Sequence, residues 1–128
     1  ATMVAIALHH IHFFTPDVDA MKAWYVRTFG AIPGRRGSFE AADLPGANLT
    51  FSRTTDPVVA TRGRLLDHLG FEVKDLEHFC QTLENQGIKL DRLYSRAPEL
   101  DTWTAFLTDP WGTYIALTEG LVNVSATA

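Results

Sequence analysis

Hydrophobic and polar positions alternate in several short stretches of the chain, a pattern typical of β-strands with one buried face. The clearest stretch is residues 8–14, which is rich in aromatic and branched side chains and stops at Thr15 and Pro16. Similar stretches predict further strands at residues 39–44, 48–53, 66–73, 88–94, 103–107 and 113–118. The chain is therefore expected to contain many short strands.

Two other stretches repeat their apolar residues at helical spacing and predict α-helices. The first helix is expected to use Thr15 as its N-cap, with Pro16 at its first position, and to end at Gly30. Its apolar positions are Val18, Met21, Tyr25 and Phe29. The second helix is expected to begin after an Asp75 N-cap and to end at Gly87. Its apolar positions are Leu76, Phe79, Cys80 and Leu83.

The order of these elements indicates an internal repeat. Each half reads as a strand, a helix and about three more strands, and a polar loop at residues 54–64 separates the halves. The repeat aligns His10 with His68, Phe13 with Phe71 and Asp17 with Asp75, and residues 49–51 with residues 115–117. We therefore expect one compact domain built from two modules, residues 1–58 and residues 59–128.

Alternation also predicts which side chains share a face of each sheet. The faces expected to pack against the helices carry Ile11, Phe13, Leu49, Phe51, Leu69, Phe71, Val73, Ile115 and Leu117. The opposite faces carry His10, His12, Asn48, Thr50, Ser52, His68, Gly70, Tyr114, Ala116 and Thr118. These polar and small side chains are typical of a sheet that curves around an occupied cavity. By the same reasoning, His9 is expected on a packed face and His78 in solvent.

Composition and charge narrow the functional classes. The net charge of −4 gives no electrostatic reason to expect nucleic acid as a partner. Arginines cluster within residues 35–64, and we interpret them as solvated loop charges, with a small anionic substrate as the minority hypothesis. No apolar run approaches the length of a membrane span, so no membrane partner is expected. Residues 1–7 lack the basic start of a signal peptide, so the cytoplasm is the default compartment, with a processed exported form left open.

The sharpest signal is a histidine at the same position in both modules. His10 and His68 would face one cavity, and two such histidines favour metal ligation or direct catalytic use over a structural role. Neutral imidazole suits Zn, Fe, Ni or Cu as a ligand. His12 shares the face of His10, and two roles stay open for it: a third metal ligand, or a hydrogen-bonding residue of the cavity wall.

These residues lie within a wider resemblance to the vicinal oxygen chelate superfamily, which includes glyoxalases, extradiol dioxygenases, and fosfomycin- and bleomycin-resistance proteins. The matching segments are residues 8–14, 17–20, 24–25, 66–76 and 106–115, so the resemblance spans nearly the whole chain. It implies an α+β fold, in which two tandem βαβββ modules form a cup-shaped mixed sheet with the helices on the outside. It also implies a small-molecule ligand or substrate and a homodimer.

In this superfamily the metal ligands come from the first and last strands of each module. By position, the resemblance places them at His10, Thr50, His68 and Ala116. Thr50 and Ala116 stand where glyoxalases have carboxylates, which argues against ordinary glyoxalase I activity. Glu119 is expected to face the other way, and Glu72 to lie too far along its strand, for either to replace the missing ligand.

The resemblance leaves two functions open. The first is a metal-dependent enzyme of the lyase, isomerase or dioxygenase type, acting on a small oxygenated substrate without an organic cofactor. A divalent metal (Zn, Fe, Mn or Ni) would be held by His10 and His68, with His12 and Tyr114 as catalytic residues. The expected substrate-binding residues are Asn48, Thr50, Ser52, Trp103 and Ala116.

The second function is a metal-free protein that binds or sequesters a small molecule, in the manner of the bleomycin-resistance proteins. An alanine at position 116 favours this function, because a missing carboxylate enlarges the cavity and weakens a metal site. The retained histidine pair disfavours it, because sequestering members need no such histidines. A recent or introduced change at Ala116, in a once complete metal site, is a further alternative.

Overall fold

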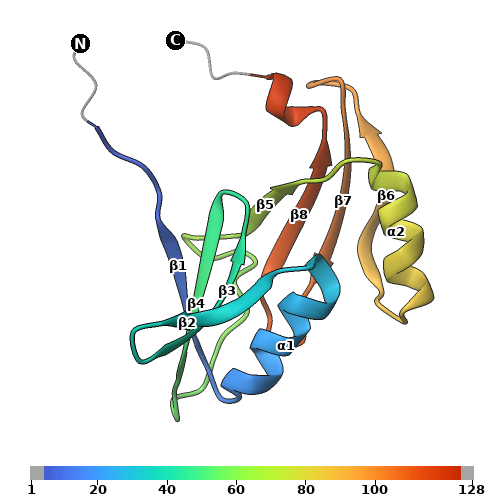
Figure 1. Ribbon diagram of the computed structural model, residues 1–128. Coiled ribbons are helices and arrows are strands. Elements are labelled where there is room, and N and C mark those ends of the chain that lie inside the picture. Colours follow the sequence, from blue (N-terminus) through green and yellow to red (C-terminus); the bar gives the residue numbers. More distant parts are fainter. Residues whose placement is uncertain (1–4, 125–128) are drawn as a thin grey trace. The chain divides into compact units, whose positions relative to one another are not determined.

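The computed structural model describes residues 5–124, and the chain divides into two compact units, Ala1–Val58 and Val59–Ala128. In the first unit the elements are β1 (His10–Thr15), α1 (Val18–Phe29), β2 (Ile32–Arg36), β3 (Phe39–Leu44) and β4 (Ala47–Arg53). In the second they are β5 (Leu69–Glu72), α2 (Leu76–Asn85), β6 (Leu90–Ala97), β7 (Thr102–Thr108), β8 (Tyr114–Glu119) and a short 3-10 helix, η1 (Leu121–Asn123). Each unit is thus a βαβββ module, as the sequence predicts (Figure 1).

The two modules have the same sheet topology. The strand order is β1-β4-β3-β2 in the first module and β5-β8-β7-β6 in the second. In each module the first strand runs parallel to the last, and the other neighbours are antiparallel. The register repeats as well, because Ile11 lies opposite Leu49 in the first sheet and Leu69 lies opposite Ile115 in the second. The predicted α+β class and tandem repeat are therefore confirmed.

Each helix packs its apolar stripe against one face of its own sheet. In the first module the ring of Phe13 stacks on Tyr25 of α1 and on Phe51 of β4, with 5.7 Å between ring centroids in both cases. In the second module Leu83 of α2 and Leu117 of β8 are fully buried. Burying one such side chain stabilises a fold by about 1.5–3 kcal/mol, so these contacts hold helix and sheet together.

The N-cap of α1 differs from the prediction. Asp17, not Thr15, caps this helix: its Oδ1 accepts the backbone N–H of Ala20 at 3.0 Å. The Thr15 hydroxyl instead accepts the N–H of Asp17 at 3.3 Å, in a turn that precedes the helix. The helix ends at Gly30 as expected, and the φ of 71° at this residue is in the left-handed region that glycine favours.

The N-terminus of α2 is capped from a distant strand. Asp75 occupies the N-cap position, but its side chain makes no capping hydrogen bond. The carboxylate of Glu119, at the end of β8, accepts the backbone N–H groups of Asp75 at 2.8 Å and Leu76 at 3.1 Å. The predicted Asp75 cap is therefore correct in position and wrong in chemistry.

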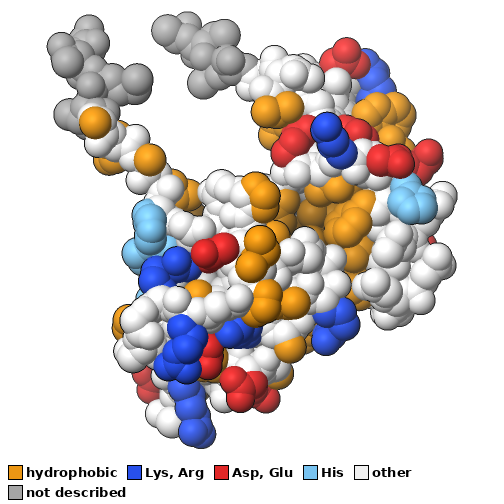
Figure 2. All heavy atoms as spheres, viewed as in Figure 1, with side chains coloured by type: hydrophobic (Ala, Val, Ile, Leu, Met, Phe, Trp, Pro, Cys, Tyr) orange, Lys and Arg blue, Asp and Glu red, His pale blue; other side chains and the backbone are white. Residues whose placement is uncertain are grey.

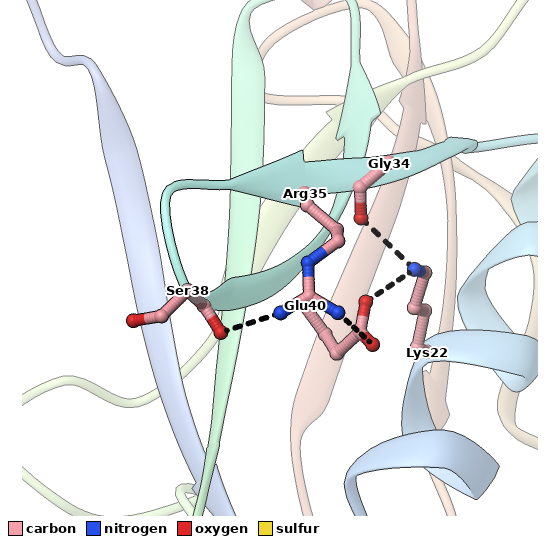
Figure 3. Close-up of polar contacts among 5 residues, drawn as sticks. All are labelled: Lys22, Gly34, Arg35, Ser38 and Glu40. Carbon is pink, nitrogen blue, oxygen red and sulfur yellow. Dashed lines mark hydrogen bonds and ion pairs between the residues drawn. The ribbon is translucent and has the colours of Figure 1, made fainter.

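Strand β2 lies in a stretch for which the sequence predicts no strand, because it contains Pro33 and Gly34. It is the edge strand of its sheet, where a proline costs no ladder hydrogen bond on the open side. Figure 3 shows how α1 fastens this edge: Lys22 donates to the carbonyl of Gly34 and to Glu40, each at 2.9 Å. Arg35 of β2 reaches the second oxygen of Glu40 at 3.3 Å.

Two strands begin later than predicted, and this changes the setting of two histidines. Strand β1 starts at His10, so His9 precedes it and is exposed rather than packed on the helix side. Strand β5 starts at Leu69, so His68 lies just before the strand instead of inside it. His78 is exposed on α2, as expected.

Charged side chains of both signs share the surface. On the face drawn in Figure 2, Lys and Arg lie next to Asp and Glu. Within residues 5–124, no helix is long and apolar enough to cross a membrane.

Candidate functional site

In the first module, the sheet face away from α1 carries a histidine–serine pair framed by aromatic rings. His12 Nε2 lies 2.6 Å from the hydroxyl of Ser52, on the neighbouring strand β4. The His12 ring stacks on Phe14 and meets Phe39 edge-on, each with 5.1 Å between centroids. We call His12, Phe14, Phe39 and Ser52 the first-module cluster. The hydrogen bond and the two ring contacts fix the orientation of the His12 ring.

Two predicted site residues lie beside this cluster. His10 shares the face of His12, as expected, but their ring centroids are 6.4 Å apart, and His10 Nδ1 contacts His9 Nδ1 at 2.9 Å. Thr50, opposite His12 in the register, is buried, and its hydroxyl accepts a bond from Arg36 Nε at 3.4 Å. A cation therefore lies at the position where the resemblance would place a carboxylate ligand.

In the second module, a carboxylate orients the candidate histidine. His68 Nδ1 donates to Asp67 Oδ2 at 2.7 Å, and Asp67 Oδ1 accepts the backbone N–H of Gly63 at 2.7 Å. The hydrogen bonds from Gly63 and then from His68 lower the pKa of Asp67, so this carboxylate stays charged at neutral pH. With Nδ1 donating to Asp67, His68 Nε2 keeps its lone pair for a ligand or a proton.

Two aromatic rings contact His68, and a guanidinium lies over one of them. Its ring meets Phe106 and Tyr114 edge-on, with 6.0 Å between centroids in both cases, and those two rings stack on each other at 5.2 Å. The guanidinium of Arg62 lies 4.7 Å from the centroid of Tyr114. We call Arg62, Asp67, His68, Phe106 and Tyr114 the second-module cluster. It combines a base, a phenol and a cation on one sheet face.

The nearby glutamates are engaged elsewhere. Glu72 accepts hydrogen bonds from the Thr118 hydroxyl at 3.0 Å and from the backbone N–H of Gly120 at 2.7 Å. Glu119 faces the helix side, as expected from alternation, and caps α2. Ala116 lies opposite Gly70, and neither of these two residues carries a carboxylate. Within residues 5–124, no three His, Cys, Asp or Glu side chains are grouped to hold a metal ion.

Trp103 lies apart from the other predicted substrate contacts. It pairs with Glu119 of β8 and with Arg96 of β6 in the strand register. Its side chain therefore lies on the same side of the sheet as Glu119, which is the side of α2. Its ring stacks on Tyr94 at 4.9 Å with an interplanar angle of 6°. Phe106 and Ala116 face the other way, so one ligand on their face would not touch the Trp103 ring within this module.

The sequence did not predict several residues of the two clusters. Asp67 directly precedes His68, and a carboxylate next to a candidate histidine was the available signal for it. Arg62 lies in a polar loop, and only the fold brings it over Tyr114. Phe39 opens β3, and only the pairing of β3 and β1 on either side of β4 brings its ring to His12.

Comparison with known proteins accounts for this architecture. No curated protein matches the chain. Among solved structures, a lactoylglutathione lyase from Agrobacterium tumefaciens is 19% identical with a TM-score of 0.68, over 91% of this chain and 95% of that one. A glyoxalase family protein from Enterococcus faecalis is 22% identical with a TM-score of 0.71, over 91% and 100%. A glyoxalase/bleomycin resistance protein/dioxygenase from Alicyclobacillus acidocaldarius is 23% identical with a TM-score of 0.65, over 88% and 89%.

At these identities the structural similarity shows the fold alone. The family itself is shown by the sequence model of the Glyoxalase/Bleomycin resistance protein/Dioxygenase superfamily, which matches residues 7–117. This span begins just before β1 and ends within β8, so it includes both βαβββ modules. The chain therefore belongs to the Glyoxalase/Bleomycin resistance protein/Dioxygenase superfamily.

Proposed function

We propose that the protein is an enzyme that acts on a small oxygenated molecule, with His68 as its proton-transferring residue. One observation carries the proposal: Asp67 holds His68 Nδ1 at 2.7 Å, which leaves Nε2 as the nitrogen that can act as a base. A carboxylate in this position fixes the ring and stabilises the imidazolium that forms when the base takes a proton. The backbone N–H of Gly63 bonds the other oxygen of Asp67, so both carboxylate oxygens have a partner.

The neighbouring side chains suit proton transfer next to a carbonyl group. Nε2 of His68 would remove a proton from the carbon beside the carbonyl. The Tyr114 phenol, whose ring lies 6.0 Å from His68, would donate a hydrogen bond to the oxygen that gains charge. Arg62 over the Tyr114 ring adds positive charge that favours an anionic intermediate. The reaction class is isomerase or lyase.

A divalent metal fits this chain incompletely. The imidazoles of His10 and His68 could each supply one nitrogen, and a carboxylate bonded to the second nitrogen is common for metal-ligating histidines. However, Thr50 and Ala116 offer no carboxylate, and Glu119 is bonded to the helix backbone. No step of the proposed reaction therefore uses a metal, and ligation by His10 and His68 stays a prediction from the sequence.

A metal-free binding protein is the second candidate, and the first-module cluster favours it. Phe14 and Phe39 are 63% and 45% exposed although both pack against His12. Exposed rings held in a fixed arrangement offer a surface on which a planar aromatic ligand can stack. Under this candidate function, ligand binding depends on the first-module cluster and not on His68.

A homodimer, expected from the resemblance, stays a prediction that sedimentation velocity can test.

Hydron exchange tests the proposal without knowledge of the natural substrate. Small ketones and hydroxyketones are incubated with the protein in D2O, and loss of the C–H signal beside the carbonyl is followed by proton NMR. We expect exchange with at least one compound, and a loss of about 10²–10⁴-fold in His68→Gln. His78→Gln, an exposed histidine on α2, is the matched control and should retain the rate. Exchange that is equal in His68→Gln and in the control would contradict the proposal.

A further inference from the structure

The second module contains a cavity of about 330 Å³ at the hairpin between β6 and β7. Its wall includes Arg92, Ser95 and Arg96 of β6 and Thr104 of β7, together with the turn that joins the two strands. The volume is at the lower end of the range for small-molecule sites. Along the two strands, most side chains of the cavity wall are thus arginines or carry a hydroxyl group.

An irregularity in β6 brings two of these side chains to one face. Arg92 lies opposite Phe106 and Ser95 lies opposite Thr104, with a register shift between them. Residues three apart on a regular strand face opposite ways, whereas a bulge of this kind restores the same side. Arg92 and Ser95 consequently share the face of Phe106 and Thr104, which is also the face of the second-module cluster. Bulges commonly re-aim side chains beside binding sites.

The two arginines of the cavity differ in availability. Arg96 is bonded to Asp101 in the adjoining turn, so its charge is already matched. Arg92 rests its guanidinium over the ring of Phe106 at 5.6 Å and has no ion pair among residues 5–124. Its forked N–H groups remain available for an oxyanion, with the hydroxyls of Ser95 and Thr104 beside it. Glu99 also lines the cavity, but it lies in the turn, past the end of β6.

Phe106 connects this cavity with the second-module cluster. Its ring lies 5.6 Å from the Arg92 guanidinium carbon and 6.0 Å from the His68 ring. A ligand that crosses one aromatic side chain can thus reach both groups. We propose that the cavity binds the anionic group, a carboxylate or a phosphate, of the small molecule whose oxygenated end meets His68. The placement of the oxygenated end of this molecule at His68 rests on the proposed function, whereas the anion site itself does not.

Three matched compounds test the anion site: glycerate, glycerol 3-phosphate and glycerol. Each is titrated into the protein at constant ionic strength, and the backbone amide shifts of Ser95 and Thr104 are followed by NMR. We expect saturable shifts with at least one of the two anions and none with glycerol. The tighter of the two anions identifies the source of the oxyanion. Equal shifts with glycerol, or shifts that never saturate, would overturn the site.

Variants separate this site from general surface charge. Arg92→Gln should weaken anion binding by about tenfold or more, because a hydrogen-bonded charge contact is lost. Arg92→Lys should fall between wild type and Arg92→Gln, since it keeps the charge but loses the fork. Arg53→Gln, an exposed arginine of the first module, should bind as wild type. Unchanged binding in Arg92→Gln overturns the anion site whatever His68 does. If the protein binds the anion but catalyses no hydrogen exchange, the proposed function of His68 is wrong and the anion site is supported.

Discussion

Glu119 at the end of β8 accepts the backbone N–H of Leu76 at 3.1 Å, so the last acidic residue of the sheet caps helix α2. This bond ties the closing strand of the second module to its helix. It also commits a carboxylate only three residues from Ala116 to the opposite side of the sheet. In the second module this glutamate therefore caps a helix and is not a ligand on the face of Ala116.

The first prediction concerns this cap. Glu119→Ala should lower the free energy of unfolding by about 1–2 kcal/mol, because two helix N–H groups lose their acceptor and the helix dipole loses a negative charge. Urea denaturation followed by circular dichroism measures the change. Glu84→Ala, an exposed glutamate of the same helix, is the control and should unfold near the wild-type midpoint. Equal midpoints for both variants would remove Glu119 as the cap.

The second prediction concerns the missing ligand. Ala116→Glu should raise zinc affinity by about tenfold or more, because it adds a carboxylate on the face of His68, roughly 7 Å along the strand direction. Isothermal titration with zinc compares it with Ala116→Gln, which has nearly the same size and no charge. Because Ala116 is 4% exposed, both variants need a folded circular dichroism spectrum first. Equal affinity in the two variants would show that this position does not complete a metal site.

A third prediction concerns the wild-type histidines. Zinc binding to the unmodified protein should be weak, because no three His, Cys, Asp or Glu side chains are grouped to hold a metal ion within residues 5–124. We expect whatever zinc remains after dialysis to fall in His10→Ala and in His68→Ala, and to persist in His78→Ala. Elemental analysis of the dialysed proteins measures it. If both substitutions leave the metal content unchanged, the repeat-related histidines are not the ligands.

A fourth prediction concerns acid stability of the first module. The hydrogen bond and charge of Lys22 lower the pKa of Glu40 below its ordinary value, with Arg35 adding to the effect. A depressed folded-state pKa stabilises the protein above the unfolded value, and this stability is lost as the pH falls through the folded pKa. Glu40→Gln should therefore be less stable than wild type at neutral pH, and the gap should close below about pH 4.3.

Thermal unfolding from pH 7 to pH 3 tests this dependence, with Glu99→Gln in an exposed turn as the control. The wild-type midpoint should fall more steeply with acid than that of Glu40→Gln. Parallel profiles would mean that the bridge between α1 and the β2–β3 hairpin in Figure 3 contributes nothing to stability.

Much of the fold was readable because it depends on periodicity. The repeat that aligns His10 with His68 predicts matching modules, and the observed register pairs His12 with Thr50 as it pairs Gly70 with Ala116. The position of Glu119 on the helix side follows from alternation in the same way. Strand β2 was missed because Pro33 and Gly34 disfavour strands in general, and only its edge position allows them.

The sequence by itself determined the repeat of two modules, the apolar face of each sheet and the place of His10 and His12 on the other face, since local alternation and helical spacing encode these features. Tertiary structure alone decided which partners those residues meet. Arg62 lies over the ring of Tyr114, Glu119 caps α2, and a bulge in β6 turns Arg92 and Ser95 to one side. Such contacts depend on strand pairing and loop geometry between distant residues, and no local pattern in the chain specifies them.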